Sequence, residues 1–246
     1  MSNSAGAHCR TSFAISPHPL ARRLGLPATL LLSVVSAPTF AADAPAVGLV
    51  EMPGPFPERS LDDWQERRFE GSTDYTLIEE AGVRVLRGRA DGTASILYRE
   101  RRVDLQATPI VEWSWKIDGV YDAIDERTHG GDDFPARLYV VARTGLLPWN
   151  TLAINYVWAS EATQGDSWPN PYTDKAMMIA VRTGSDEAGR WVRERRDVAA
   201  DFRAAFGERV DAIAGYAVMV DGDDGKRKAT AWFGDLAFVP HGDGAP

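Results

Sequence analysis

The sequence predicts an all-β protein, an antiparallel β-sandwich of jelly-roll type with one short helix near the C-terminal third. Ten short runs alternate apolar and polar side chains, as strands do when one face of a sheet is buried. Turn sequences such as those at Gly82 and Gly92 separate several runs, and only one segment repeats its apolar residues at helical spacing. The absence of repeated strand–long helix units argues against a doubly wound parallel sheet.

The run 110–117 shows the alternation most clearly, since Trp113 and Trp115 share one face of the strand while Glu112 and Lys116 share the other. Side chains on one face of such a strand are expected in the core, and those on the other face outside it. The ten predicted strands are 75–80, 83–90, 95–103, 110–117, 134–142, 152–158, 177–182, 191–197, 213–220 and 229–238.

Residues 198–206 are predicted as the one regular helix. Asp197 is placed to cap its N-terminus with a carboxylate oxygen, and Gly207 is placed to end it in a left-handed conformation. Residues 61–69 are expected to form one or two further helical turns, ahead of the first strand.

The first 41 residues have the pattern of a secretory signal peptide. Arg22 and Arg23 precede an apolar run over 24–35, and small residues follow up to Ala41. The run is shorter than the ~20 residues of a membrane-spanning helix, so we expect cleavage after Ala41, a periplasmic or secreted location and no membrane span in the mature protein. An uncleaved membrane anchor is the alternative. The expected organisation is a signal peptide (1–41), a proline-rich extended lead (42–60), a single β-sandwich domain (61–240) and a disordered tail (241–246).

Charge and cysteine content exclude several classes of function. The chain has 27 basic and 35 acidic residues and a net charge of -8, which argues against a nucleic-acid partner because that role needs a basic surface. The single cysteine, Cys9, lies in the predicted signal peptide, so no disulfide is expected once that peptide has been removed. No cluster of histidine and cysteine has the spacing of a zinc site, and only His129 is available for a catalytic triad.

Polar residues on the predicted strands form the candidate ligand-binding site. Asp133, Arg137 and Tyr139 fall on one face of their strand, and a carboxylate beside a guanidinium is able to hold a polar ligand. Trp168 lies in a long connection, as does Trp149, and both are candidates for stacking on a sugar. If strand 110–117 neighbours strand 134–142, one groove is lined by Glu112, Lys116, Arg137, Tyr139 and Asn155. For Asp133 and Arg137 the alternative is an ion pair that closes the end of the strand. For the groove the alternative is a solvated sheet face with charge pairs between its strands.

An acidic turn between the last two predicted strands is a candidate metal site. Asp221, Asp223 and Asp224 offer carboxylate oxygens, which are the ligands that calcium prefers. The spacing differs from that of an EF-hand loop, and an ordinary turn rich in Asp and Gly is the alternative. A structural calcium ion is the one cofactor that the sequence suggests.

The combination of these motifs resembles a bacterial secreted family named for its domain of unknown function 3047. The resemblance implies a single secreted all-β domain and no established activity, and it marks Asp132, Asp133, Arg137, Asn155 and Asp221 as motif positions. The residues that carry it are Ala94-Ser95 with Leu97, Val103-Asp104, Glu112-Trp113-Ser114-Trp115, Asp132-Asp133-Phe134-Pro135-Ala136-Arg137, Asn155-Tyr156-Val157-Trp158, Asp201-Phe202, Phe206-Gly207, Asp221-Gly222-Asp223-Asp224 and Trp232-Phe233-Gly234-Asp235.

Three functions remain open from the sequence. The first is a binding module for a carbohydrate or another polar envelope ligand. The second is a glycan hydrolase or lyase that uses paired carboxylates such as Asp133 and Glu112 beside Arg137. The third is an envelope scaffold or assembly partner that acts through a sheet edge or an apolar patch.

Overall fold

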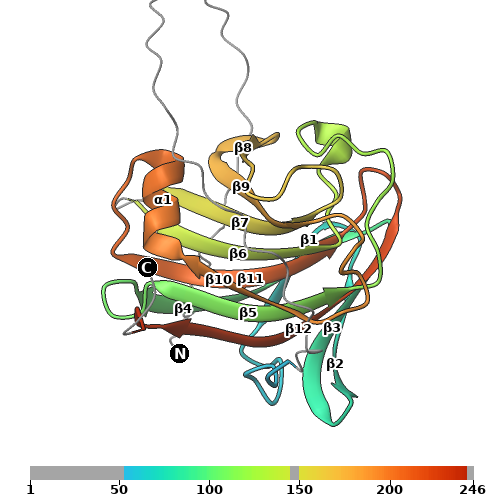
Figure 1. Ribbon diagram of the computed structural model, residues 1–246, viewed down its shortest axis with the longest axis horizontal. Helices are drawn as coiled ribbons and strands as arrows, with labels where there is room; N and C mark the ends of the chain where they lie inside the picture. The colour runs from blue at the N-terminus through green and yellow to red at the C-terminus, as the bar shows by residue number, and fades with distance from the viewer. Residues whose placement is uncertain (1–52, 145–149, 243–246) are drawn as a thin grey trace, which may run out of the picture.

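A computed structural model describes residues 53–144 and 150–242 of the chain. Two β-sheets pack face to face within these ranges, and one helix lies at one side of them (Figure 1). The sandwich of jelly-roll type with a single α-helix that the alternation predicts is thereby confirmed. The predicted signal peptide and Trp149 lie outside the described residues. No helix in the described ranges is both long and apolar enough to cross a membrane.

The seven-stranded sheet has the strand order β1-β4-β11-β6-β7-β9-β8, and the five-stranded sheet has the order β10-β5-β12-β3-β2. All neighbours are antiparallel except β7 and β9, which are parallel. The elements are β1 (Gln65–Glu70), β2 (Asp74–Glu80), β3 (Val83–Asp91), β4 (Ala94–Asp104), β5 (Ile110–Ile117), the 3-10 turn η1 (His129–Gly131), β6 (Ala136–Arg143), β7 (Thr151–Ala159), β8 (Ser167–Asn170), β9 (Thr173–Thr183), β10 (Val192–Asp197), α1 (Val198–Phe206), β11 (Ala212–Asp221) and β12 (Lys228–Val239).

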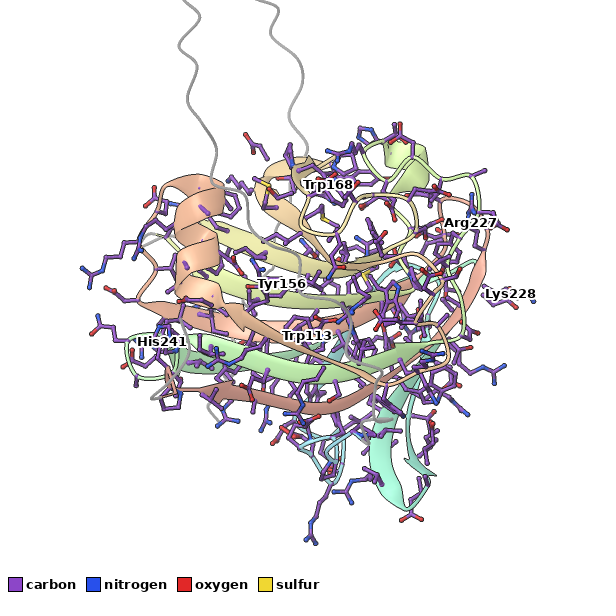
Figure 2. All side chains as sticks on the ribbon, viewed as in Figure 1. Trp113, Tyr156, Trp168, Arg227, Lys228 and His241 are labelled. Carbon is purple, nitrogen blue, oxygen red and sulfur yellow. The ribbon has the colours of Figure 1, made fainter. Side chains whose placement is uncertain are left out.

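The core between the sheets is built from large aromatic side chains. Trp113 of β5 lies 5.4 Å from Tyr156 of β7, and Trp115 lies 5.8 Å from Trp158, measured between ring centroids. Figure 2 shows Trp113 and Tyr156 in the middle of the molecule. Because these contacts join the two sheets, the residues between them in sequence, Ser114 and Val157, point to the two outer faces of the sandwich.

Helix α1 begins and ends where the sequence predicts. The carboxylate of Asp197 accepts a hydrogen bond of 2.8 Å from the amide of Ala200, and Gly207 follows the helix with a φ of 69°. Phe202 is fully buried on the inward side of the helix. Capping, apolar spacing and the terminal glycine therefore agree, as they do in a locally consistent sequence.

Two segments differ from the sequence prediction. Residues 61–69 do not form a helix: a single turn at Leu61–Trp64 leads into β1, which pairs with β4 at the edge of the larger sheet. The connection after β7 contains a short strand, β8, in which Pro169 is tolerated because β8 is an edge strand. Both strands form through long-range pairing with a sheet edge, which local sequence patterns do not reveal.

Candidate functional site

The residues predicted to line one groove lie on two opposite faces of the sandwich. Lys116 and Glu112 belong to β5 and point away from the core on the five-stranded sheet, whereas Arg137 and Tyr139 on β6 do so on the seven-stranded sheet. Tyr139 pairs directly with Asn155 of β7, so those two do share a face. The prediction of a single groove is wrong because β5 and β6 belong to different sheets.

Asp133 and Glu112, the predicted pair of catalytic carboxylates, also lie on different sheets. Glu112 lies on the five-stranded sheet, whereas Asp133 precedes β6 of the other sheet. Glu112 forms an ion pair of 2.9 Å with Arg195, its neighbour on β10. Glycoside chemistry needs two carboxylates that face each other across the substrate, so this pair with Arg137 cannot perform it.

Arg137 forms a buried ion cluster at the start of β6. Its guanidinium binds both carboxylate oxygens of Asp221, with an Nε–Oδ1 distance of 2.8 Å, and lies 3.4 Å from the carboxylate of Asp132. The side chain is 3% exposed, and its guanidinium lies 4.5 Å from the ring centroid of Phe134. The cluster joins the end of β11 to the loop before β6, which is a structural role.

One guanidinium serves two buried carboxylates in this cluster. Burial raises the pKa of Asp221, although Arg137 acts in the opposite direction. Burial also raises the pKa of Asp132, which additionally accepts a hydrogen bond of 3.0 Å from Asn170. A buried carboxylate without its cation is costly, so this cluster depends on Arg137.

Asp133 holds the acidic loop between β11 and β12. It is fully buried and accepts hydrogen bonds from the amides of Asp224 and Gly225, at 3.1 and 2.7 Å. Carboxylate oxygens of Asp133, Asp223 and Asp224 lie within 4.8 Å of one another, whereas both oxygens of Asp221 are bound to Arg137. The group that could hold a cation therefore contains Asp133 in place of the predicted Asp221.

Trp168 is a packing residue in the structure. It lies in β8, is 4% exposed and stacks on Phe134 with 6.4 Å between ring centroids. Its indole N–H donates a hydrogen bond to the carbonyl of Glu126, and Arg127 lies over its ring. These contacts close a small second core on the outside of the larger sheet, so Trp168 does not offer the free ring that the sequence predicts.

Two other tryptophans occupy the outer face of the five-stranded sheet. Trp191, directly before β10, and Trp232 on β12 are partly exposed. Lys116 lies between them, with its Nζ 5.3 Å from the ring centroid of Trp191 and 4.3 Å from that of Trp232. We call Trp191, Lys116, Trp232 and Arg87 the tryptophan row, because Trp232 pairs across the strands with both Lys116 and Arg87.

The tryptophan row was not predicted from the sequence, although the sequence does indicate the outward position of Trp232. Ala231 and Phe233 are buried in the core, so alternation along β12 directs Trp232 outward. Trp191 opens the predicted strand 191–197. It precedes the paired residues of β10, where Val192 takes the inward position opposite Trp115.

A polar hollow adjoins the tryptophan row on the same face. Its volume is about 460 Å³. Thr230 of β12 pairs with Arg89 of β3, and both residues line the hollow. Thr230 lies two residues before Trp232, and Arg89 lies two residues after Arg87, so the hollow lies beside the tryptophan row. Lys228, labelled at the edge of the molecule in Figure 2, contributes to its lining. The charged and hydroxyl side chains that line the hollow include those of Asp74, Arg89, Asp91, Asp118, Lys228 and Thr230.

Comparison with known proteins places the chain in a family. It belongs to DUF3047, described as a protein of unknown function, whose profile matches residues 62–237, and this confirms the resemblance of the sequence motifs. No curated protein matches the chain.

Solved structures with a similar outline have very different sequences. The enzymatically active domain of tailspike protein 4 from bacteriophage CBA120 is 6% identical, with a TM-score of 0.37, over 74% of this chain and 20% of that one. The present chain thus spans about a fifth of the tailspike chain. Two carbohydrate-binding modules are similar to the same extent, each with 11% identity and a TM-score of 0.35. For a family 4 module the match covers 73% of this chain and 96% of that one. For a mannan-recognising module it covers 74% of this chain and 91% of that one. Likeness at this level carries no inference about function.

Proposed function

We propose that the protein binds a carbohydrate on the outer face of its five-stranded sheet. The observation that carries this proposal is the position of Trp191 and Trp232, two partly exposed rings on either side of Lys116 and beside a polar hollow. Sugars bind where an aromatic ring contacts their apolar C–H face while charged side chains bind their hydroxyl groups. The predicted signal peptide makes the periplasm or the cell exterior the proposed place of binding.

Contacts around Lys116 hold the tryptophan row in place. Its ammonium forms an ion pair with Glu80 of β2 and lies over the ring of Trp232. The lysine side chain is only 13% exposed, so it is fixed by its neighbours before a ligand arrives. A pre-positioned surface loses less conformational entropy on binding, which favours affinity.

Alanine variants at Trp191 and Trp232 test the proposal. Each is expected to weaken binding at least about tenfold, since truncation of a central tryptophan in an interface typically costs about 2 kcal/mol or more. Affinity gel electrophoresis over a panel of soluble neutral and acidic polysaccharides measures the loss. Phe69→Ala is the matched control, because Phe69 is 50% exposed but lies on β1 of the other sheet.

The control should bind as the unaltered protein does. Polysaccharide retardation that survives both tryptophan substitutions, or that Phe69→Ala weakens equally, would contradict the proposal. So would a complete lack of retardation by every polysaccharide of the panel.

Calcium binding at the acidic loop remains a separate proposal, now with Asp133, Asp223 and Asp224 as ligands. Burial raises the pKa of Asp223 and of Asp224, and the nearby carboxylate of Asp133 raises both further. A divalent cation would offset this repulsion between the carboxylates. We expect calcium to raise the melting temperature, by an amount that corresponds to about 2.7 kcal/mol at a free concentration a hundredfold above Kd. The Asp223→Asn variant should lose the response and Asp62→Asn, in an exposed turn, should keep it. An unchanged melting temperature in calcium would remove this proposal.

A further inference from the structure

A second row of side chains crosses the outer face of the five-stranded sheet beside the tryptophan row. Thr230 of β12 pairs with Arg89 of β3, and Arg89 pairs in turn with Asp74 of β2. The amide of Asp118, which follows β5, donates to the carbonyl of Thr230, and its carboxylate accepts from the amide of Thr230, both at 2.9 Å. We call Asp118, Thr230, Arg89 and Asp74 the polar row, and all four line the hollow.

The two rows run parallel and close together. Thr230 lies two residues from Trp232 on β12, as Arg89 does from Arg87 on β3, and two residues of a strand span about 7 Å. A sugar whose apolar face lies on Trp232 therefore reaches the polar row with the hydroxyl groups along one edge of its ring. A chain that contacts both Trp232 and Trp191 runs across the strands, because β12 and β10 lie on either side of β5.

The charges in the hollow do not favour an ionic ligand of either sign. Its lining contains three carboxylates, those of Asp74, Asp91 and Asp118, and two cations. Lys228 already forms an ion pair of 2.8 Å with Asp91, so an anionic ligand would gain only Arg89 and would lie among like charges. A cationic ligand would lie beside the same two cations.

Hydrogen-bond donors and acceptors both remain available in the polar row. Arg89 is exposed, and it makes no hydrogen bond or ion pair with any residue in 53–144 or 150–242. Asp118 is also exposed, and its carboxylate accepts one hydrogen bond within those ranges, although a carboxylate can accept about four. A sugar hydroxyl both donates and accepts, so hydroxyl groups can satisfy the two side chains without adding charge.

We infer that the glycan bound by this face is a neutral hexose polymer that lies across the strands, with Arg89 and Asp118 binding hydroxyl groups of one sugar; this inference rests on the proposed function. Arg89 and Asp118 lie on either side of Thr230, so a sugar edge above Thr230 has a donor on one side and an acceptor on the other. Hydrogen bonds to charged side chains are stronger than those between neutral groups, so these two residues select sugars with unsubstituted hydroxyl groups. The net charge of -8 acts in the same direction, because it repels polyanions.

The test compares three neutral oligomers with an acidic form of each. Mannohexaose and cellohexaose are compared with the products of oxidation of their primary alcohols to carboxylates, and carboxyl-reduced oligogalacturonate is compared with oligogalacturonate itself. Isothermal titration calorimetry at low salt should detect binding of at least one neutral oligomer. Its acidic form should bind at least about tenfold more weakly, because like charges repel strongly at low ionic strength.

Two substitutions test the polar row. Arg89→Gln and Asp118→Asn should each weaken binding of the neutral oligomer about tenfold, since each removes a hydrogen bond to a charged group. Asp118→Asn should also narrow the difference between the neutral and acidic forms, because it removes a negative charge, whereas Arg89→Gln should widen that difference. Arg209→Gln is the matched control and should bind as the unaltered protein does, since Arg209 is exposed, lies in the α1–β11 connection and carries the same charge as Arg89.

The results distinguish this inference from the proposed function. Acidic forms that bind as tightly as the neutral ones, with affinity lost in Trp191→Ala and Trp232→Ala, would overturn the neutral ligand and leave the carbohydrate-binding face supported. An unchanged affinity for the neutral oligomer in either Arg89→Gln or Asp118→Asn would overturn the role of the polar row. No measurable binding of any oligomer would overturn this inference, and the polysaccharide panel would then decide the proposed function alone.

Discussion

Replacing Arg137 with alanine is expected to lower the free energy of unfolding by about 3–5 kcal/mol, the usual cost of removing one partner from a buried ion pair. Asp221 and Asp132 are 1% and 7% exposed, and both would lose their cation. The protein would have to protonate them or admit water into the site. Urea unfolding followed by far-ultraviolet circular dichroism measures the change.

Two further variants make this result interpretable. Arg195→Ala removes an exposed ion pair with Glu112 and should cost no more than about 1 kcal/mol. Adding Asp221→Asn to Arg137→Ala removes one of the stranded charges and should recover part of the lost stability, even where the single variant fails to fold. A loss in Arg137→Ala no larger than that in Arg195→Ala would show that the cluster is not needed for the fold.

Trp158→Ala is expected to destabilise the protein by about 3–5 kcal/mol through the cavity it would leave in the core. The side chain is fully buried between the sheets, where its ring lies 5.8 Å from that of Trp115. Its indole N–H also donates a hydrogen bond of 3.0 Å to the carbonyl of Gly184, which would be left without this donor. Thermal and urea unfolding should both report the loss.

The exposed aromatic residue Phe69 provides the comparison for this core variant. Phe69→Ala is expected to change stability by no more than about 0.5 kcal/mol, as surface substitutions usually do. A similar small effect for Trp158→Ala would mean that the two sheets do not pack on each other through the described aromatic contacts.

Alternation along the chain was sufficient to predict which large side chains of β5 lie in the core. Trp113 and Trp115 are in the core and Lys116 is outside it, as the sequence indicates. The helix was predictable to its ends because Asp197 and Gly207 act locally, through a cap and a left-handed residue. Both kinds of information depend only on neighbours in sequence.

The membership of strands in sheets was not predictable, since it depends on contacts between distant segments. Lys116 and Arg137 are each on an outer face, but only the pairing of β5 with β12 and of β6 with β7 shows that these are different faces. Trp168 was taken for a loop residue because β8 forms only by pairing with β9. The tryptophan row itself joins residues from β3, β5 and β12 with Trp191 just before β10, so no local pattern could assemble it.

The most direct test of the carbohydrate-binding face is the indole N–H region of a ¹⁵N–¹H correlation spectrum, assigned with single Trp→Phe variants. The protein is titrated separately with an acidic oligosaccharide, oligogalacturonate, and with its neutral, carboxyl-reduced form. The signals of Trp191 and Trp232 are expected to move, while those of Trp113, Trp115 and Trp158 stay in place. Shifts confined to other tryptophans, or no shift of Trp191 and Trp232 in either titration, would contradict it.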